Sequence, residues 1–188
     1  MKIGLYFGSF NPIHIGHLII ASHIIEHTDL KRVWFVVSPH NPLKQAATLL
    51  NEYNRLHLVQ TAIDSDSRFK ASDAEFKLPK PSYTIDTLTY LFEKYPTYEF
   101  IVIMGSDSYR NLHRWKNYEL LVKNFSIIVY NRPGFEVKDN LYNATILNAP
   151  LLDISSTTIR ERLKNGKSIR YLVSDPVFKE LSENGYYK

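Results

Sequence analysis

A short segment near the amino end of the chain combines histidines and glycines in a spacing that suits the binding of an anion. Residues 8–17 read GSFNPIHIGH, which places His14 and His17 three positions apart. On a helical turn this spacing puts both imidazoles on one side, where they can donate hydrogen bonds to phosphate oxygens and where either ring could be protonated. Gly8 permits a tight turn and a close approach of the backbone to a ligand. Gly16 leaves room for a phosphate beside the exposed N–H groups of a helix start.

Two other interpretations of the histidine pair stay open. An HxxH pair can chelate a metal ion, but no third ligand is obvious nearby in the sequence. The two rings can also cap a helix without binding any ligand. Because the pair follows a strand-like run and lies among glycines, we favour the anion site and expect no metal bound by the protein itself.

A second segment, rich in hydroxyl groups, lies far along the chain. Residues 154–162 read ISSTTIRER and begin a helical pattern. Hydroxyls at a helix start cap its free N–H groups, and Thr158 and Glu161 have the spacing of a capping box. Such a helix start is also an anion site, beside which Arg160 can clamp phosphates or form only a surface salt bridge. The predicted phosphate contacts are Ser155, Ser156, Thr157 and Arg160.

Short apolar runs alternate with longer amphipathic runs over the whole chain. The apolar runs predict strands at 2–7, 32–38, 99–104, 125–130 and 145–148. The amphipathic runs predict helices at 16–27, 48–63, 84–94, 156–164 and 176–183, of which the second is capped by Thr48 or Asn51.

This alternation predicts an α/β protein with right-handed strand–helix–strand units and a doubly wound, mostly parallel sheet. Strands that are apolar throughout fit burial on both faces of the sheet. No linker or internal repeat interrupts the pattern, so we expect a single domain over 1–188, with a small helical part from about residue 154. Ligands of such a sheet bind beyond the carboxyl ends of its strands, and the unusual residues follow those ends.

The composition is typical of a globular protein and excludes several kinds of site. The chain has 188 residues, of which 44% are hydrophobic and 22% charged, and this excludes a disordered chain. It has no cysteine, which excludes a disulfide scaffold, a thiolate zinc site and a cysteine nucleophile. The formal net charge of +4 favours anionic partners, but the basic residues are scattered, and we expect no nucleic-acid partner.

The sequence also bears on location and assembly. No window reaches the ~20 apolar residues that span a bilayer, and the first apolar run stops at Gly8, too early for a signal peptide. We therefore expect a cytoplasmic protein with no membrane partner. The sequence leaves the oligomeric state open, a homo-oligomer included.

Together the two segments resemble the nucleotidylyltransferase superfamily, whose HxGH and ISSTxIR motifs correspond to residues 14–17 and 154–160. Within it, three further segments are similar to the bacterial nicotinate-mononucleotide adenylyltransferases. They are NPLK at 41–44, SYTIDTL at 82–88, and GSD at 105–107 followed by Trp115. The resemblance covers roughly residues 2–183 and implies a Rossmann-like fold.

The resemblance implies roles for single residues. It implies His14, His17 and Arg160 as catalytic residues. It implies ATP-binding residues at Gly8, Ser9, Phe10, Gly16, Gly105, Asp107, Ser155, Ser156 and Thr157. It implies pyridine-nucleotide-binding residues at Asn41, Lys44, Ser82, Tyr83, Thr84 and Trp115.

Two of these residues have a structural alternative. Asp107 follows the most apolar strand and can accept hydrogen bonds from ribose hydroxyls, but it could instead cap the next helix. Trp115 lies in a polar stretch, where it can stack on a pyridine ring or be a half-buried core residue.

The implied reaction joins ATP to nicotinate mononucleotide and yields deamido-NAD and pyrophosphate, a step of NAD biosynthesis, with Mg²⁺ carried in by ATP. A transferase of the same superfamily that uses nicotinamide mononucleotide or phosphopantetheine is the nearer alternative. A non-enzymatic module that binds nucleotides or RNA is the more distant one, and its RNA binding would depend steeply on salt.

Overall fold

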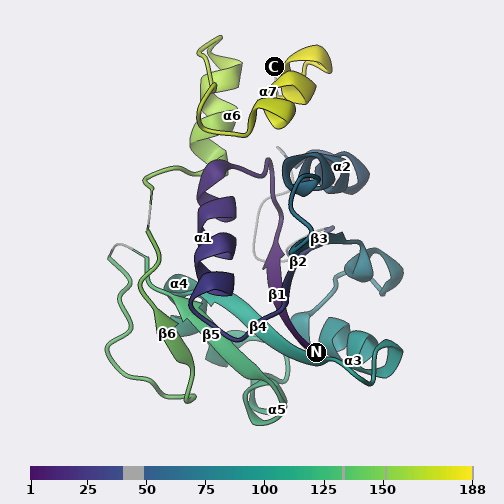
Figure 1. Ribbon diagram of the computed structural model, residues 1–188, viewed down its shortest axis with the longest axis vertical. Helices are drawn as coiled ribbons and strands as arrows, with labels where there is room; N and C mark the ends of the chain where they lie inside the picture. Colours follow the sequence, from purple (N-terminus) through teal and green to yellow (C-terminus); the bar gives the residue numbers. More distant parts are fainter. Residues whose placement is uncertain (40–48, 133, 151, 188) are drawn as a thin grey trace.

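The computed structural model, which describes residues 1–39, 49–132, 134–150 and 152–187, contains a parallel sheet flanked by helices (Figure 1). The described residues form six strands in the order β3-β2-β1-β4-β5-β6, and every neighbouring pair is parallel. The arrangement confirms the predicted doubly wound, Rossmann-like α/β fold. The strands are β1 (Lys2–Gly8), β2 (Arg32–Val37), β3 (Phe69–Ser72), β4 (Glu99–Gly105), β5 (Ser126–Tyr130) and β6 (Thr145–Leu147).

Among the described residues, helices lie between most successive strands, and two more follow the last strand. They are α1 (Ile15–Glu26), α2 (Glu52–Ile63), α3 (Thr84–Lys94), α4 (Ser106–Arg110), α5 (Tyr118–Asn124), α6 (Ser156–Lys164) and α7 (Asp175–Glu183), with the short 3₁₀ helices η1 (Ala74–Lys77) and η2 (Leu112–Arg114). Within the described part of the chain, no helix has the length and apolar character needed to cross a membrane.

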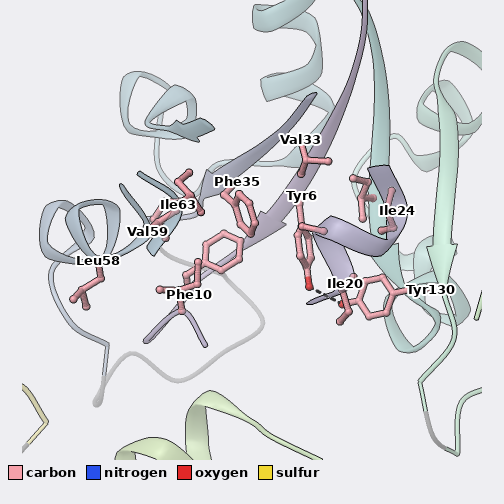
Figure 2. Close-up of a cluster of buried hydrophobic side chains, with 14 of the residues drawn as sticks. Tyr6, Phe10, Ile20, Ile24, Val33, Phe35, Leu58, Val59, Ile63 and Tyr130 are labelled. Atoms are coloured by element: carbon pink, nitrogen blue, oxygen red, sulfur yellow. Dashed lines mark hydrogen bonds between the residues drawn. The ribbon is translucent and has the colours of Figure 1, made fainter. Parts of the chain in front are cut away.

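Strand side chains are buried on both faces of the sheet because helices cover both faces. On β1, Tyr6 belongs to the core shared with α1 and α2, whereas Ile3 and Leu5 belong to the core shared with α3 and α5. Figure 2 shows the first core, where the rings of Tyr6, Phe10 and Phe35 lie with centroids 5.8, 5.6 and 5.5 Å apart. Burial on both faces explains why the strands read as continuous apolar runs.

The strand order reverses between β1 and β4. β1 pairs with β2 on one side and with β4 on the other, which makes the carboxyl ends of β1 and β4 the switch point where ligands bind in this fold. Gly8 ends β1 and Gly105 ends β4. Helices α6 and α7 lie beyond this edge, at the top of Figure 1, and the Ile15 N–H at the start of α1 donates to the Leu172 carbonyl over 3.0 Å.

Every predicted strand and helix is present. The helix predicted at 48–63 begins at Glu52, and Asn51 caps it by accepting the Tyr53 N–H at 2.9 Å; the other candidate cap, Thr48, lies outside the described residues. The sequence missed β3, α4 and α5. These elements have between four and seven residues, which is too short for a periodic pattern.

Candidate active site

A cleft of about 870 Å³ opens at the switch point. Residues from the two motif segments and from the middle segments line it together, although they are far apart in the sequence. Gly16 is not among the lining residues, and Asn41 and Lys44 lie outside the described part of the chain. The predicted residues that line the cleft are Gly8, Ser9, Phe10, His14, His17, Ser82, Tyr83, Thr84, Gly105, Asp107, Trp115, Ser155, Ser156, Thr157 and Arg160.

Direct hydrogen bonds join the histidine-bearing turn to the hydroxyl-rich turn. The Ser156 hydroxyl donates to the Pro12 carbonyl at 2.8 Å, and the Arg160 guanidinium donates to the Asn11 carbonyl at 2.8 Å. The Arg160 guanidinium also donates to the Thr157 hydroxyl at 3.2 Å. These bonds fix the start of α6 beside the histidines, as a shared phosphate site requires.

The start of α6 differs in one detail from the prediction. Ser155 is the N-cap, and its hydroxyl oxygen accepts the Thr158 N–H at 3.1 Å. The predicted capping box of Thr158 with Glu161 is therefore wrong, because the helix begins three residues earlier than that box would need. The earlier start leaves Ser155, Ser156 and Thr157 on the wall of the cleft.

The two histidines stack on each other, with ring centroids 3.7 Å apart. The His14 backbone N–H donates to His17 Nδ1 at 3.2 Å, so a neutral His17 carries its proton on Nε2. Burial, helped by the positive charge of Arg132, lowers the pKa of His14 to about 4. His14 is therefore neutral at pH 7 in the protein alone, and its protonation beside a bound phosphate stays a prediction.

The glycines make room for side chains of the site. A Cβ on Gly8 would lie 2.9 Å from the Phe10 ring, and one on Gly16 would lie 3.1 Å from the His14 ring. The His14 ring thus lies directly beside Gly16, and a phosphate contact at Gly16 stays a prediction. Phe10 itself is buried, and its backbone has a φ of 43°. Residues other than glycine rarely adopt this left-handed conformation, and it is often retained at functional turns.

Asp107 has a partner that the sequence did not reveal. Helix α4 begins at Ser106 with Gly105 as its N-cap, so the alternative role of Asp107 as a cap is wrong. Its carboxylate instead accepts a hydrogen bond from the Arg132 guanidinium at 2.9 Å. The Arg132 backbone N–H is held in turn by the Ser106 hydroxyl at 2.8 Å. Arg132 also lines the cleft and adds a positive charge to its lining.

A buried carboxylate supports the SYT segment at the start of α3. The Ser82 hydroxyl donates to Glu75 Oε2 at 2.8 Å, and Thr87 approaches Oε1 at 3.5 Å. Glu75 is 3% exposed, and this burial raises its pKa, against hydrogen bonds from Ser82, Ser38 and Thr87 that lower it. Trp115 is half-buried: it packs against the core and also lines the cleft, so the structure agrees with both interpretations of this side chain.

Arg55 connects the turns that follow β1 and β2 by hydrogen bonds. This side chain of α2 is fully buried and donates to four backbone carbonyls. The acceptors are Ser9 at 2.6 Å, Ser38 at 2.7 Å, Leu50 at 2.7 Å and Pro39 at 2.8 Å. A guanidinium can satisfy several acceptors in one plane, which an ammonium cannot.

Comparison with known proteins agrees with the motifs. Over its whole length the chain is 52% identical to all of a Flavobacterium psychrophilum protein, and 50% identical to 98% of one from Cytophaga hutchinsonii; both carry the name "Probable nicotinate-nucleotide adenylyltransferase". A solved structure of Plasmodium falciparum nicotinic acid mononucleotide adenylyltransferase complexed with NaAD has a TM-score of 0.83 at 22% identity, over 99% of this chain and 97% of that one. At this identity the structural likeness concerns the fold alone.

Residues 5–162 match the cytidylyltransferase-like family, and this range contains both motif turns, the second half of β1 and all of β2 to β6. Together with the full-length relatives, the match confirms the resemblance seen in the motifs: the chain belongs to the cytidylyltransferase-like family.

Proposed function

We propose that this protein is an adenylyltransferase of NAD biosynthesis, which joins ATP and nicotinate mononucleotide to give deamido-NAD and pyrophosphate. The observation that carries the proposal is the convergence of the two motif turns on one cleft, through the bonds from Ser156 and Arg160 to the 11–12 backbone. The full-length relatives named for the same activity support it.

The reaction is an in-line displacement. An oxygen of the mononucleotide 5′-phosphate forms a bond to the α-phosphorus of ATP, and the bond between that phosphorus and the oxygen bridging to the β-phosphate breaks. The attacking oxygen is anionic at neutral pH, so no general base is needed. The barrier lies in bringing two polyanions together, and the protein lowers it by positioning them and stabilising charge.

The two turns divide this work. His17 donates from Nε2 to the α-phosphate as charge builds up there, and the stacked His14 supports it. The start of α6 and Arg160 hold the β- and γ-phosphates. Asp107 and the backbone at Gly8 and Gly105 receive the adenosine part, as the resemblance implies. The mononucleotide lies near Trp115 and near the segment Ser82, Tyr83 and Thr84, which Glu75 holds through Ser82.

Mg²⁺ enters with ATP as part of the substrate. Within the described ranges, no group of three or more His, Cys, Asp or Glu side chains could hold a metal ion. In this proposal the polyphosphate and water supply most of the Mg²⁺ ligands, as is usual for this ion.

Pyrophosphate release measures the proposal directly. The purified chain is incubated with MgATP and, in separate reactions, with nicotinate mononucleotide, nicotinamide mononucleotide or phosphopantetheine, each with and without Mg²⁺. We expect the highest kcat/KM with nicotinate mononucleotide and little turnover after chelation of Mg²⁺. Faster turnover of nicotinamide mononucleotide or phosphopantetheine would identify a different adenylyltransferase of the same superfamily. Absence of pyrophosphate, with salt-sensitive RNA binding, would overturn the enzymatic function.

A further inference from the structure

Tyr187, which follows α7, makes a hydrogen bond to the turn that bears the two histidines. Its hydroxyl donates to the side-chain oxygen of Asn11 at 2.6 Å, across 176 positions of the chain. Asn11 lies in the turn between β1 and α1, is 4% exposed and lines the cleft. Tyr187 lies outside all the motif segments, so no short-range pattern indicates this contact.

The turn around Asn11 is held from several directions. The Asn11 side-chain oxygen also accepts the Leu50 backbone N–H at 3.1 Å, and the Asn11 backbone carbonyl accepts from Arg160 at 2.8 Å. The neighbouring Phe10 has a left-handed φ of 43°, a costly conformation that persists only where its surroundings hold it. Because His14 follows in the same turn as the N-cap of α1, a displacement of residue 11 also moves the histidines.

The surroundings of the Tyr187 hydroxyl suit a fixed donor. The ring packs, partly buried, against the core shared with α1 and α2. Burial raises the pKa of Tyr187, against the positive charges of Arg55 and Arg160, which lower it, so the phenol is protonated at neutral pH and can donate. Arg55 belongs to α2 and Arg160 to α6. The hydroxyl thus lies where the histidine turn, α2 and α6 meet.

We infer that Tyr187 is a positioning residue of the proposed adenylyl transfer. Its hydroxyl fixes the Asn11 side chain, and through it the turn that presents His14 and His17 to the ATP phosphates. A displacement of about 1 Å in such a group can cost about a hundredfold in rate, so one hydrogen bond to the turn matters for catalysis. The inference rests on the proposed function, because it concerns the turn that we assign to ATP.

Removing one oxygen atom tests this role. Tyr187→Phe loses the hydroxyl and retains the ring, and we expect kcat to fall about fivefold or more, as for one lost hydrogen bond. KM for the mononucleotide, whose proposed site lies near Trp115, should change little. Tyr186→Phe is the matched control, since Tyr186 packs against the same core, and its kcat should be unchanged. Undiminished kcat in Tyr187→Phe, or an equal loss in the control, would overturn the inference.

A double-mutant cycle separates positioning from a general loss of structure. In a His17→Ala background the turn lacks the donor that Tyr187 positions, so Tyr187→Phe should lower the remaining kcat by less than about twofold. Single-turnover pyrophosphate release measures these low rates. The same loss in both backgrounds would show that Tyr187 acts on the stability of the fold and not on the histidine turn, and would contradict the inference.

The histidine ring signals in ¹H–¹⁵N spectra of the protein without ligand give a readout that needs no turnover. Tyr187→Phe should shift the signals of His14 and His17, and it should leave those of His23 and His27, at the end of α1, in place. This readout keeps the two hypotheses apart. An unaltered chain that releases no pyrophosphate would overturn the proposed function, whereas unmoved His14 and His17 signals would overturn the positioning role of Tyr187.

Discussion

Ser156 donates a hydrogen bond from its hydroxyl to the carbonyl of Pro12, 2.8 Å away and 144 positions earlier in the chain. Arg160 makes the matching bond to the neighbouring Asn11 carbonyl. Both acceptors are backbone atoms, so α6 is fixed to the path of the turn and not to particular side chains in it. The two turns that we propose as phosphate-binding elements are thus positioned without a ligand, which would reduce the entropy lost when ATP binds.

The geometry of Arg160 gives the first prediction. Arg160→Lys keeps the charge but loses the planar fork that reaches both the Asn11 carbonyl and the Thr157 hydroxyl. We expect kcat/KM for ATP to fall about tenfold, or about 1.4 kcal/mol in transition-state stabilisation. Arg162→Lys in the same helix is the matched control, since Arg162 bonds to the Ser168 carbonyl instead. Equal losses in the two variants would show that the effect is one of helix stability alone.

His17 provides the second prediction. His17→Ala removes the Nε2 donor that we assign to the α-phosphate, and kcat should fall at least about a hundredfold, a typical loss for one transition-state contact. His23→Ala on the same helix tests for a general effect on α1, because His23 stacks on His27 instead of lining the cleft. Steady-state pyrophosphate release measures both. Near-normal turnover in the His17 variant would remove its role in charge stabilisation.

The sequence was sufficient for the architecture because the strands are buried on both faces and the main helices are long enough to be periodic. It was also sufficient for the two motif turns, whose residue types are unusual for plain turns. It could not reveal Glu75, Arg55 or Arg132. Each acts through contacts with distant segments: Arg55 looks like an ordinary helix residue, yet its side chain is fully buried on backbone carbonyls. Short-range patterns do not record such contacts.

Trp115 provides the third prediction. Trp115→Ala should raise KM for nicotinate mononucleotide several-fold more than KM for ATP, because the indole is expected to present its face to the pyridine ring. Trp115→Phe keeps an aromatic face and should recover most of the loss. Separate titrations of the two substrates measure the effect. An equal rise in both KM values would indicate that Trp115 acts only as a core residue.

Glu75 provides the fourth prediction, as a positioning residue. Glu75→Ala leaves Ser82 without its acceptor and loosens the start of α3, so KM for the mononucleotide should rise about fivefold or more, or about 1 kcal/mol for a lost buried hydrogen bond. KM for ATP should change little. Glu75→Gln retains one acceptor oxygen, so its KM for the mononucleotide should lie between that of the unaltered chain and that of Glu75→Ala. Glu93→Ala, exposed on α3, is the control, and melting temperatures identify any variant that merely unfolds.

The lowered pKa of His14 makes the stability of the folded protein depend on pH. Because its pKa is about 4 in the folded protein and about 6.5 in an unfolded chain, the unfolded state binds more protons between these values. Stability must therefore fall as pH drops through 6.5 toward 4, by about 1 kcal/mol between pH 7.5 and 5.5 from this group. Urea unfolding at the two pH values measures the loss.

A comparison of variants isolates the contribution of His14 to this slope. His14→Asn cannot be protonated in this range, so its stability should fall less between pH 7.5 and 5.5 than that of the unaltered chain. His113→Asn, an exposed site on η2, should retain the full decline. An unchanged slope in the His14 variant would mean that the ring is as easily protonated in the folded protein as in the unfolded chain. The assignment of a neutral His14 ring at pH 7 would then have to be abandoned.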